Sequence, residues 1–154
     1  MQRIIIVDSP SDWPLELPDV HVVSGMEYLT SEAFKKQRNV KVFNICRSYK
    51  YQTIGYYVSL LAAARGHKPV PSVATIQDMK SQAIVKLASD EIDELIQRSL
   101  ADLSSDEFVL SIYFGKNLAK KYARLSAQLY RMFHTPFVRA HFHREHGKWA
   151  LRKV

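Results

Sequence analysis

Runs of apolar residues bounded by polar turns predict several strands. Residues 3–8, RIIIVD, form a continuous apolar run that ends at an Asp-Ser-Pro turn, as a buried strand does. Val20–Ser24 predicts a second strand, which stops before Gly25. Val40–Cys46 predicts a third, and its β-branched residues with few polar positions are typical of a strand covered on both faces. Residues 108–114, FVLSIYF, predict a fourth strand.

Apolar residues spaced three to four apart predict helices between these strands. From about residue 51 to 65 they recur at helical spacing, and Gly66 stands where a left-handed residue would end the helix. Thr75–Asp78 resembles a capping box, and Ser89 with two acidic residues after it predicts another helix start. The clearest stripe follows Asn117, which we expect to cap its helix. That stripe is Leu118, Tyr122, Leu125, Leu129 and Met132.

The last part of the chain predicts a β-hairpin. After Pro136, residues 137–144 alternate strictly between apolar and polar, and His146-Gly147 predicts a tight turn into a last strand, 148–154. Strands alternating with helices predict an α/β fold: a layered, largely parallel mixed sheet flanked by helices, with this C-terminal antiparallel β-hairpin. We expect residues 1–154 to form a single domain. Because the sequence stops in mid-strand, we also expect this domain to be excised from a longer chain.

Length and composition exclude two broad classes. With 154 residues, 47% of them hydrophobic, the chain can bury an ordinary core. Cys46 is the only cysteine, so the chain is no disulfide-stapled secreted scaffold, and we expect a cytoplasmic location. The sequence begins without a signal-peptide pattern, and no stretch approaches the roughly 18 apolar residues of a membrane span.

The positive charge is concentrated in the last quarter of the chain. Residues 1–112 hold 12 Lys+Arg and 14 Asp+Glu, whereas residues 113–154 hold 10 Lys+Arg and only one acidic residue, Glu145. Such asymmetry is typical of a part that binds nucleic acid or another acidic partner. It is equally typical of an anion-binding face, or of a surface that docks on an acidic neighbouring domain. Charge alone does not rank these alternatives.

Two predicted turns from strand to helix carry cationic and hydrogen-bonding groups. Ligands of open α/β sheets lie beyond the carboxyl ends of the strands, and a helix start favours anions. We therefore predict a ligand site for an anion at these turns, the alternative being a solvated helix cap with surface aromatic residues. The candidate residues are Asn44, Arg47, Ser48, Tyr49, Lys50, Tyr51 and Gln52 in the first turn, and Gly115, Lys116 and Asn117 in the second.

The histidines near the end of the chain give only weak evidence for a metal site. His141, His143 and His146 could form a metal site, but Arg139 and Arg144 among them would oppose a cation. We therefore expect a solvated basic face and no metal site.

Other motifs point to no catalytic residue. Gly115-Lys116 lacks the other positions of a phosphate-binding loop, and no Gly-rich dinucleotide fingerprint is present. We expect Cys46 to be a buried structural thiol, although Arg47 and the following helix start could lower its pKa. Asp8 could orient a ligand or another loop, or simply cap its own turn.

Two long segments resemble a known family. They are residues 43–80, FNICRSYKYQTIGYYVSLLAAARGHKPVPSVATIQDMK, and residues 110–142, LSIYFGKNLAKKYARLSAQLYRMFHTPFVRAHF. Both resemble the RimK-like ATP-grasp N-terminal domain family, and the likeness covers most of the chain. The Arg65-Gly66-His67 string is similar to helix ends in the N-terminal domains of other ATP-grasp enzymes.

The resemblance implies a domain that precedes an ATP-grasp ligase domain. ATP-grasp enzymes activate a carboxylate as an acyl phosphate and join it to an amine. ATP and Mg²⁺ are therefore expected in the downstream ATP-grasp domain, with no cofactor in this one. The implied partners are that downstream domain of the same chain and a small anionic or peptide substrate. No membrane partner is expected, and nucleic acid is not the expected partner.

These observations favour a non-catalytic substrate-recognition or docking domain of an ATP-dependent carboxylate–amine ligase. The alternative is a basic nucleic-acid-binding module, although the helix that carries Lys120 and Arg124 has the pattern of an ordinary core-and-solvent helix. A third hypothesis is an autonomous enzyme that uses Cys46 with a histidine. The nucleic-acid module would use Lys116, Lys120, Lys121, Arg124, Arg131, Arg139, Arg144 and Lys148.

Overall fold

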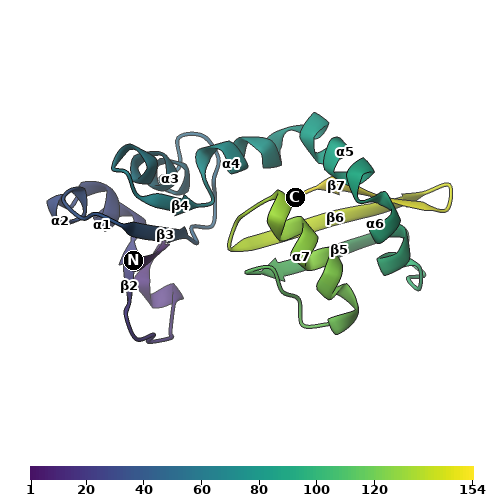
Figure 1. Cartoon of the computed structure of the whole chain (residues 1–154), viewed down its shortest axis with the longest axis horizontal. Helices are drawn as coiled ribbons and strands as arrows, with labels where there is room; N and C mark the ends of the chain where they lie inside the picture. Colours follow the sequence, from purple (N-terminus) through teal and green to yellow (C-terminus); the bar gives the residue numbers. More distant parts are fainter. The chain divides into compact units, whose positions relative to one another are not determined.

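A computed structural model describes all residues of the chain, 1–154, and contains two separate sheets (Figure 1). The chain divides into two units, Met1–Ile76 and Gln77–Val154, and each has its own sheet and its own hydrophobic core. The α/β class expected from the sequence pattern is confirmed. None of the helices combines the length and the apolar character that crossing a membrane requires.

The first unit contains a parallel four-stranded sheet in the order β2-β1-β3-β4. In the central strand β1, Ile4 to Val7 are buried without interruption, so both of its faces are covered. In β3, by contrast, Lys41 and Phe43 are only half-buried, and the expectation that both faces of this strand are covered is wrong. The strands are β1 (Gln2–Val7), β2 (Val20–Ser24), β3 (Val40–Asn44) and β4 (Lys68–Val70).

The helices of the first unit follow local caps. The predicted helix α3 (Ile54–Ala64) begins after Thr53, whose Oγ1 accepts a hydrogen bond from Tyr56 N at 3.4 Å, and Gly66 has the expected positive φ. The sequence pattern did not predict the short elements η1 (Pro10–Asp12), α1 (Gly25–Thr30) and α2 (Glu32–Lys35). Helix α4 (Val73–Lys80) follows β4 and crosses the boundary between the units. A short helix was predicted here, but its predicted start at Thr75 is wrong, because Thr75 lies inside the helix and its N–H donates to Ser72 Oγ at 3.1 Å.

The second unit contains an antiparallel sheet in the order β5-β6-β7. The predicted hairpin is confirmed as β6 (Phe137–Glu145) and β7 (Lys148–Lys153), joined at His146-Gly147. Strand β5 (Glu107–Tyr113) pairs with β6 and not with the parallel sheet, which corrects the expectation of one mixed sheet. An apolar run shows that a strand is buried, but it does not identify the strand's partner.

Helices cover only one face of this second sheet. Their apolar side chains pack with the inward residues of the three strands in one core. The helical elements are α5 (Gln82–Glu91), α6 (Asp93–Leu100), the 3₁₀ turn η2 (Lys120–Tyr122) and α7 (Ala123–Met132).

Two further predicted helix starts are wrong. Ser89 lies inside α5, because Ser81 caps that helix, and α6 begins only at Asp93. Asn117 does not cap α7, which begins at Ala123. Leu118 therefore lies outside the helical stripe and is 99% exposed. In both places a polar residue that could cap a helix makes a different hydrogen bond.

Candidate functional site

The first predicted turn lies where the strand order of the parallel sheet reverses. From β1 the chain goes to β2 at one side, and β3 then returns to the other side of β1. The crevice beyond the strand ends at such a switch point is the usual ligand position of open α/β sheets. Asp8 follows β1 and Arg47 follows β3, so both residues flank this position.

Arg47 meets two carboxylates at the switch point. Its backbone N–H donates to Asp8 Oδ2 at 2.9 Å, its Nε lies 3.9 Å from the same oxygen, and its Nη2 lies 3.2 Å from Asp12 Oδ1. The Arg47 side chain is 78% exposed. The expected cation is therefore present, but it lies between two acidic groups. Exposed ion pairs contribute only about 0–1 kcal/mol, so a ligand can compete for these side chains.

Asn44 fixes the loop after β3 through buried hydrogen bonds. Its buried Nδ2 donates to Gly55 O at 2.7 Å and to Ser59 Oγ at 2.9 Å, while its Oδ1 accepts from Cys46 N at 3.2 Å. Tyr49 OH donates to the Asn44 carbonyl at 2.5 Å. The amide of Asn44 thus joins the end of β3 to α3, and its hydrogen bonds lie within the protein.

The rest of this loop folds against the first turn of α3. Thr53 Oγ1 donates to Ser48 O at 3.2 Å and to Lys50 O at 2.6 Å. Tyr51 is exposed and packs edge-on against the ring of Tyr56, with 5.5 Å between centroids. Lys50 and Gln52 are also exposed, and Gln52 has a positive φ. These residues remain predicted ligand contacts on an ordered loop.

Cys46 is not set up for nucleophilic chemistry. Burial, followed by the neighbouring Asp8 carboxylate and its hydrogen bond, raises the pKa of the Cys46 thiol to about 12. A thiol that stays protonated at neutral pH is a poor nucleophile. The structure therefore supports the buried structural thiol and gives no support to an enzyme based on Cys46.

The second predicted turn is not a helix start. Tyr113 and Lys116 exchange backbone hydrogen bonds of 2.8 and 3.0 Å, and Phe114 and Gly115 between them both have positive φ, as in a type I′ turn. Asn117 Nδ2 donates to Ser111 O at 2.7 Å. The helix-end contribution expected for an anion is therefore absent here. Lys116 is exposed, while the Asn117 amide is used within the loop.

The two turns belong to different units, the first to Met1–Ile76 and the second to Gln77–Val154. Each is therefore a separate candidate. The ligand-binding roles of both sets of residues remain predictions.

Two cations proposed for nucleic acid are engaged within the second unit. Arg144 donates to Asp106 Oδ1 at 2.9 Å and stacks on the ring of Trp149, and Lys148 Nζ lies 3.3 Å from Asp93 Oδ2. The structure gathers no group of three or more side chains that could hold a metal ion.

The Arg65-Gly66-His67 segment holds the first unit together. Arg65 donates to the carbonyl groups of Tyr28 and Leu29 at 2.7 and 3.2 Å. His67 Nε2 lies 3.3 Å from the Gln37 carbonyl, so Nε2 carries the proton and Nδ1 accepts from Tyr28 OH at 2.7 Å. The segment thus joins the end of α3 to α1.

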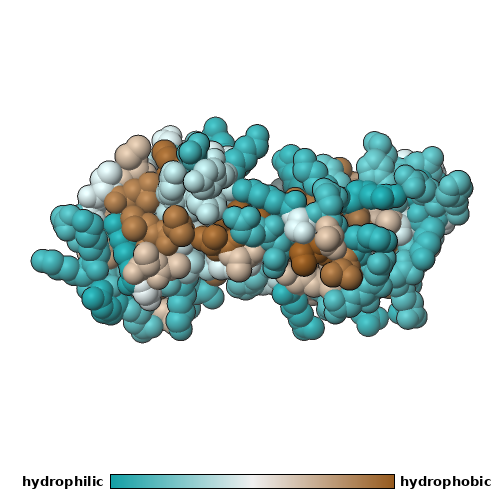
Figure 2. Space-filling model, turned by 90° about the horizontal axis from the view of Figure 1, so that it is seen from above, coloured by the Kyte–Doolittle hydropathy of each residue, from teal (hydrophilic) through white to brown (hydrophobic).

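Sequence reasoning missed the apolar outer face of α3. No charged residue occurs between Ile54 and Ala64, and hydrophobic surface gathers over this part of the first unit (Figure 2). A groove of about 450 Å³ is lined by Leu29, Tyr57, Leu60, Leu61 and Ala64. The absence of charge over three helical turns was the signal that could have revealed it.

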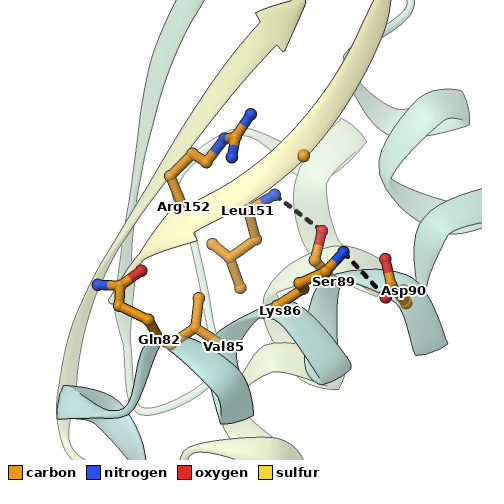
Figure 3. A pocket seen from close by; sticks show the side chains of 8 residues that line it. Gln82, Val85, Lys86, Ser89, Asp90, Leu151 and Arg152 are labelled. Carbon is orange, nitrogen blue, oxygen red and sulfur yellow. Dashed lines mark hydrogen bonds and ion pairs between the residues drawn. The ribbon is translucent and has the colours of Figure 1, made fainter.

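A pocket of about 340 Å³ with a mixed polar and apolar lining lies between α5 and β7 (Figure 3). Ser89 Oγ accepts a hydrogen bond from Leu151 N at 3.0 Å at its wall, and Lys86 pairs with Asp90 at 3.7 Å. Ser89 therefore has a structural task that its place in the sequence did not indicate.

The first unit has a parallel sheet with a polar switch point, and the second has an antiparallel sheet with helices on one face, so the chain is a mixed α/β protein. The model of the RimK-like ATPgrasp N-terminal domain family matches residues 26–154, and the chain belongs to that family. The resemblance of the two sequence segments is thereby confirmed. No curated protein matches the chain.

Proposed function

We propose that this chain is a non-catalytic substrate-recognition domain of an ATP-dependent carboxylate–amine ligase. Its membership of the RimK-like ATP-grasp N-terminal domain family supports a link to ATP-grasp chemistry. In this proposal, an ATP-grasp domain of the same polypeptide binds ATP and Mg²⁺ in the cytoplasm and performs the reaction. The domain described here holds a substrate at its switch point.

The meeting of Arg47 with Asp8 and Asp12 carries the proposal. Asp8 and Asp12 come from the connection after β1 and Arg47 comes from the loop after β3, and the three side chains converge beyond the carboxyl ends of these strands. A guanidinium binds carboxylates through paired N–H donors, and its exposure leaves it accessible to a small anionic or peptide substrate. Beneath it, Asn44 and Cys46 are buried and fix the loop.

The test compares Arg47→Ala with the unaltered enzyme in the full-length protein. Amino acids and dipeptides serve as probes, and their stimulation of ADP release is measured at saturating ATP. We expect the KM for the stimulating compound to rise about tenfold, which corresponds to the loss of one charge-assisted hydrogen bond. The affinity for ATP should stay unchanged.

Arg98→Ala is the matched control, because Arg98 is also an exposed arginine paired with a carboxylate, Glu94, at 2.8 Å. It should leave the KM unchanged. Equal KM values for Arg47→Ala and the unaltered enzyme would refute the role of the switch point. A full-length protein without an ATP-grasp domain would refute the link to a ligase.

A further inference from the structure

The second sheet has one face that no element of its own unit covers. Helices α5 to α7 pack on the face that carries Leu110, Ile112 and Ala140. The alternate residues of the strands point to the opposite face, because side chains alternate along a strand. Across the strands this open face has the rows Tyr113–Phe137, Ser111–Arg139 and Val109–His141–Lys153, followed by Glu107–His143–Ala150 and Glu145–Lys148 at the far end.

Aromatic rings occupy one end of the open face. Tyr113 and Phe137 are 50% and 40% exposed, and their rings meet edge-to-face with 5.2 Å between centroids. Phe114 adds a third exposed ring, 6.3 Å from Phe137. Large aromatic side chains at the surface of a soluble domain are typical of a binding site.

Cationic side chains follow directly after the aromatic row. No carboxylate lies within 4.0 Å of Arg139 or Lys153. The two acidic residues at the far end of the sheet are already paired: Glu107 lies 3.7 Å from His143 Nδ1, and Glu145 lies 3.0 Å from Arg152 Nη2. The free cations therefore form a stripe beside the rings.

We propose that this open sheet face binds single-stranded nucleic acid. Tyr113 and Phe137 would stack on bases, while Arg139 and Lys153 would contact phosphates. Sheets with exposed aromatic residues and neighbouring cations bind unpaired bases in this way. Residues two apart on a strand are separated by about 6.7 Å, so the stripe from Phe137 to His141 extends over about 13 Å, which is room for a few nucleotides.

The surface shares Arg139 with the basic module considered from the sequence but does not include that module's lysines in η2. Lys120 and Lys121 lie in η2, within the helical layer that covers the other face of the sheet, and Lys121 Nζ lies 4.9 Å from the centroid of the Tyr122 ring. They therefore serve as an internal comparison, because removing them takes away two positive charges without altering the open face.

The experiment measures fluorescence anisotropy of a labelled oligouridylate of about ten nucleotides with the whole chain at about 50 mM salt. We expect binding whose logarithmic salt slope is about −1.4, since each of the two phosphate contacts on a single strand contributes about −0.7. The double variant Tyr113→Ala/Phe137→Ala should weaken binding at least about tenfold.

Two further variants separate binding from folding. Arg139→Glu reverses an exposed charge without removing any buried side chain, and it should also weaken binding at least about tenfold. The matched control, Lys120→Ala/Lys121→Ala, should change the affinity less than about threefold. Circular dichroism spectra check that every variant is folded.

Three outcomes would overturn the proposal. The first is no binding at low salt. The second is an equal loss for the lysine variant and for the sheet-face variants, which would indicate diffuse attraction by net charge. In the third, a decaglutamate peptide competes as strongly as the oligouridylate, which would make an acidic polypeptide the ligand.

Discussion

The side-chain amide of Gln97 pairs with the backbone of Trp149 as a neighbouring strand would. Gln97 Nε2 donates to Trp149 O at 2.6 Å, and Trp149 N donates to Gln97 Oε1 at 2.9 Å. Because β7 is an edge strand, its outer backbone groups have no strand partner. Gln97 and Ser89, whose Oγ accepts from Leu151 N, bind that edge from α6 and α5.

Gln97→Ala should therefore destabilise the second unit. The substitution leaves two backbone groups of Trp149 without their partner, which costs about 1–3 kcal/mol in free energy of unfolding. Urea denaturation followed by tryptophan fluorescence measures this change, since Trp149 lies in the core. Gln82→Ala, a glutamine of α5 at the surface, should cost less than about 0.5 kcal/mol. Equal effects would contradict the pairing.

The Cys46 thiol should resist alkylation in the folded chain. Its pKa is raised to about 12, chiefly by burial and then by Asp8, so iodoacetamide at pH 8 should react only after unfolding. Asp8→Asn removes the negative charge and should accelerate the reaction. Asp12→Asn should not, since Asp12 contributes nothing to this pKa. Mass spectrometry of the alkylated chain gives the rates.

The same thiol links stability to alkaline pH. The unfolded chain loses the Cys46 proton near pH 9, whereas the folded chain keeps it until about pH 12. The stabilising contribution is therefore complete below pH 9 and is lost as the pH rises through this window. The free energy of unfolding should fall less steeply in Cys46→Ala over the same range. Parallel curves for the two proteins would contradict the raised pKa.

His67 should make the first unit sensitive to acid. Burial, followed by Arg65 and Arg38, lowers the pKa of His67, although the hydrogen bond to Gln37 acts in the opposite direction. The unfolded chain takes up this proton near pH 6.5 and the folded chain only at lower pH. Stability is thus lost as the pH falls below 6.5. Thermal denaturation of His67→Asn, which cannot titrate, should show a weaker decline over that range.

Gly55→Ala should destabilise the chain, although alanine is the better helix former. A Cβ at this position would lie 2.0 Å from the Ser48 carbonyl oxygen and 2.9 Å from Cys46 Cβ, so the loop or the helix must shift at a cost of about 3 kcal/mol. Gly66→Ala meets open space and has only its positive φ to accommodate, which costs about 1 kcal/mol. Chemical denaturation distinguishes the two values. A stabilised Gly55→Ala would refute the close contact.

The sequence predicted the elements that have a long or strict pattern. Strands β1, β2, β3, β6 and β7 and helix α3 lie where their apolar patterns indicated. The short helices α1 and α2 were missed, since six and four residues show too little periodicity. The strand β4 was missed because it has only three residues and contains Pro69. Their positions depend on tertiary contacts, such as those of Arg65 with Tyr28.

The sequence indicated where Arg47 would lie, but it did not indicate the two carboxylates that lie beside it. The cation at the end of β3 was recognised from the turn, and the topology does place Arg47 at the switch point. Its partners Asp8 and Asp12 lie far earlier in the sequence, so local spacing could not associate them with it. Likewise, the hydrogen bonds that engage Asn44 and Asn117 were not visible in their local motifs.

Phe114 has a left-handed backbone conformation, with φ of 50°, at a turn position where asparagine adopts this conformation at lower energetic cost. For a residue with a large side chain this conformation costs about 1–2 kcal/mol. Selection for thermal robustness alone would replace this phenylalanine. The turn therefore gives up folding free energy where it carries a ring at the rim of the sheet, and protein engineers who stabilise this domain by relieving backbone strain would remove that ring first.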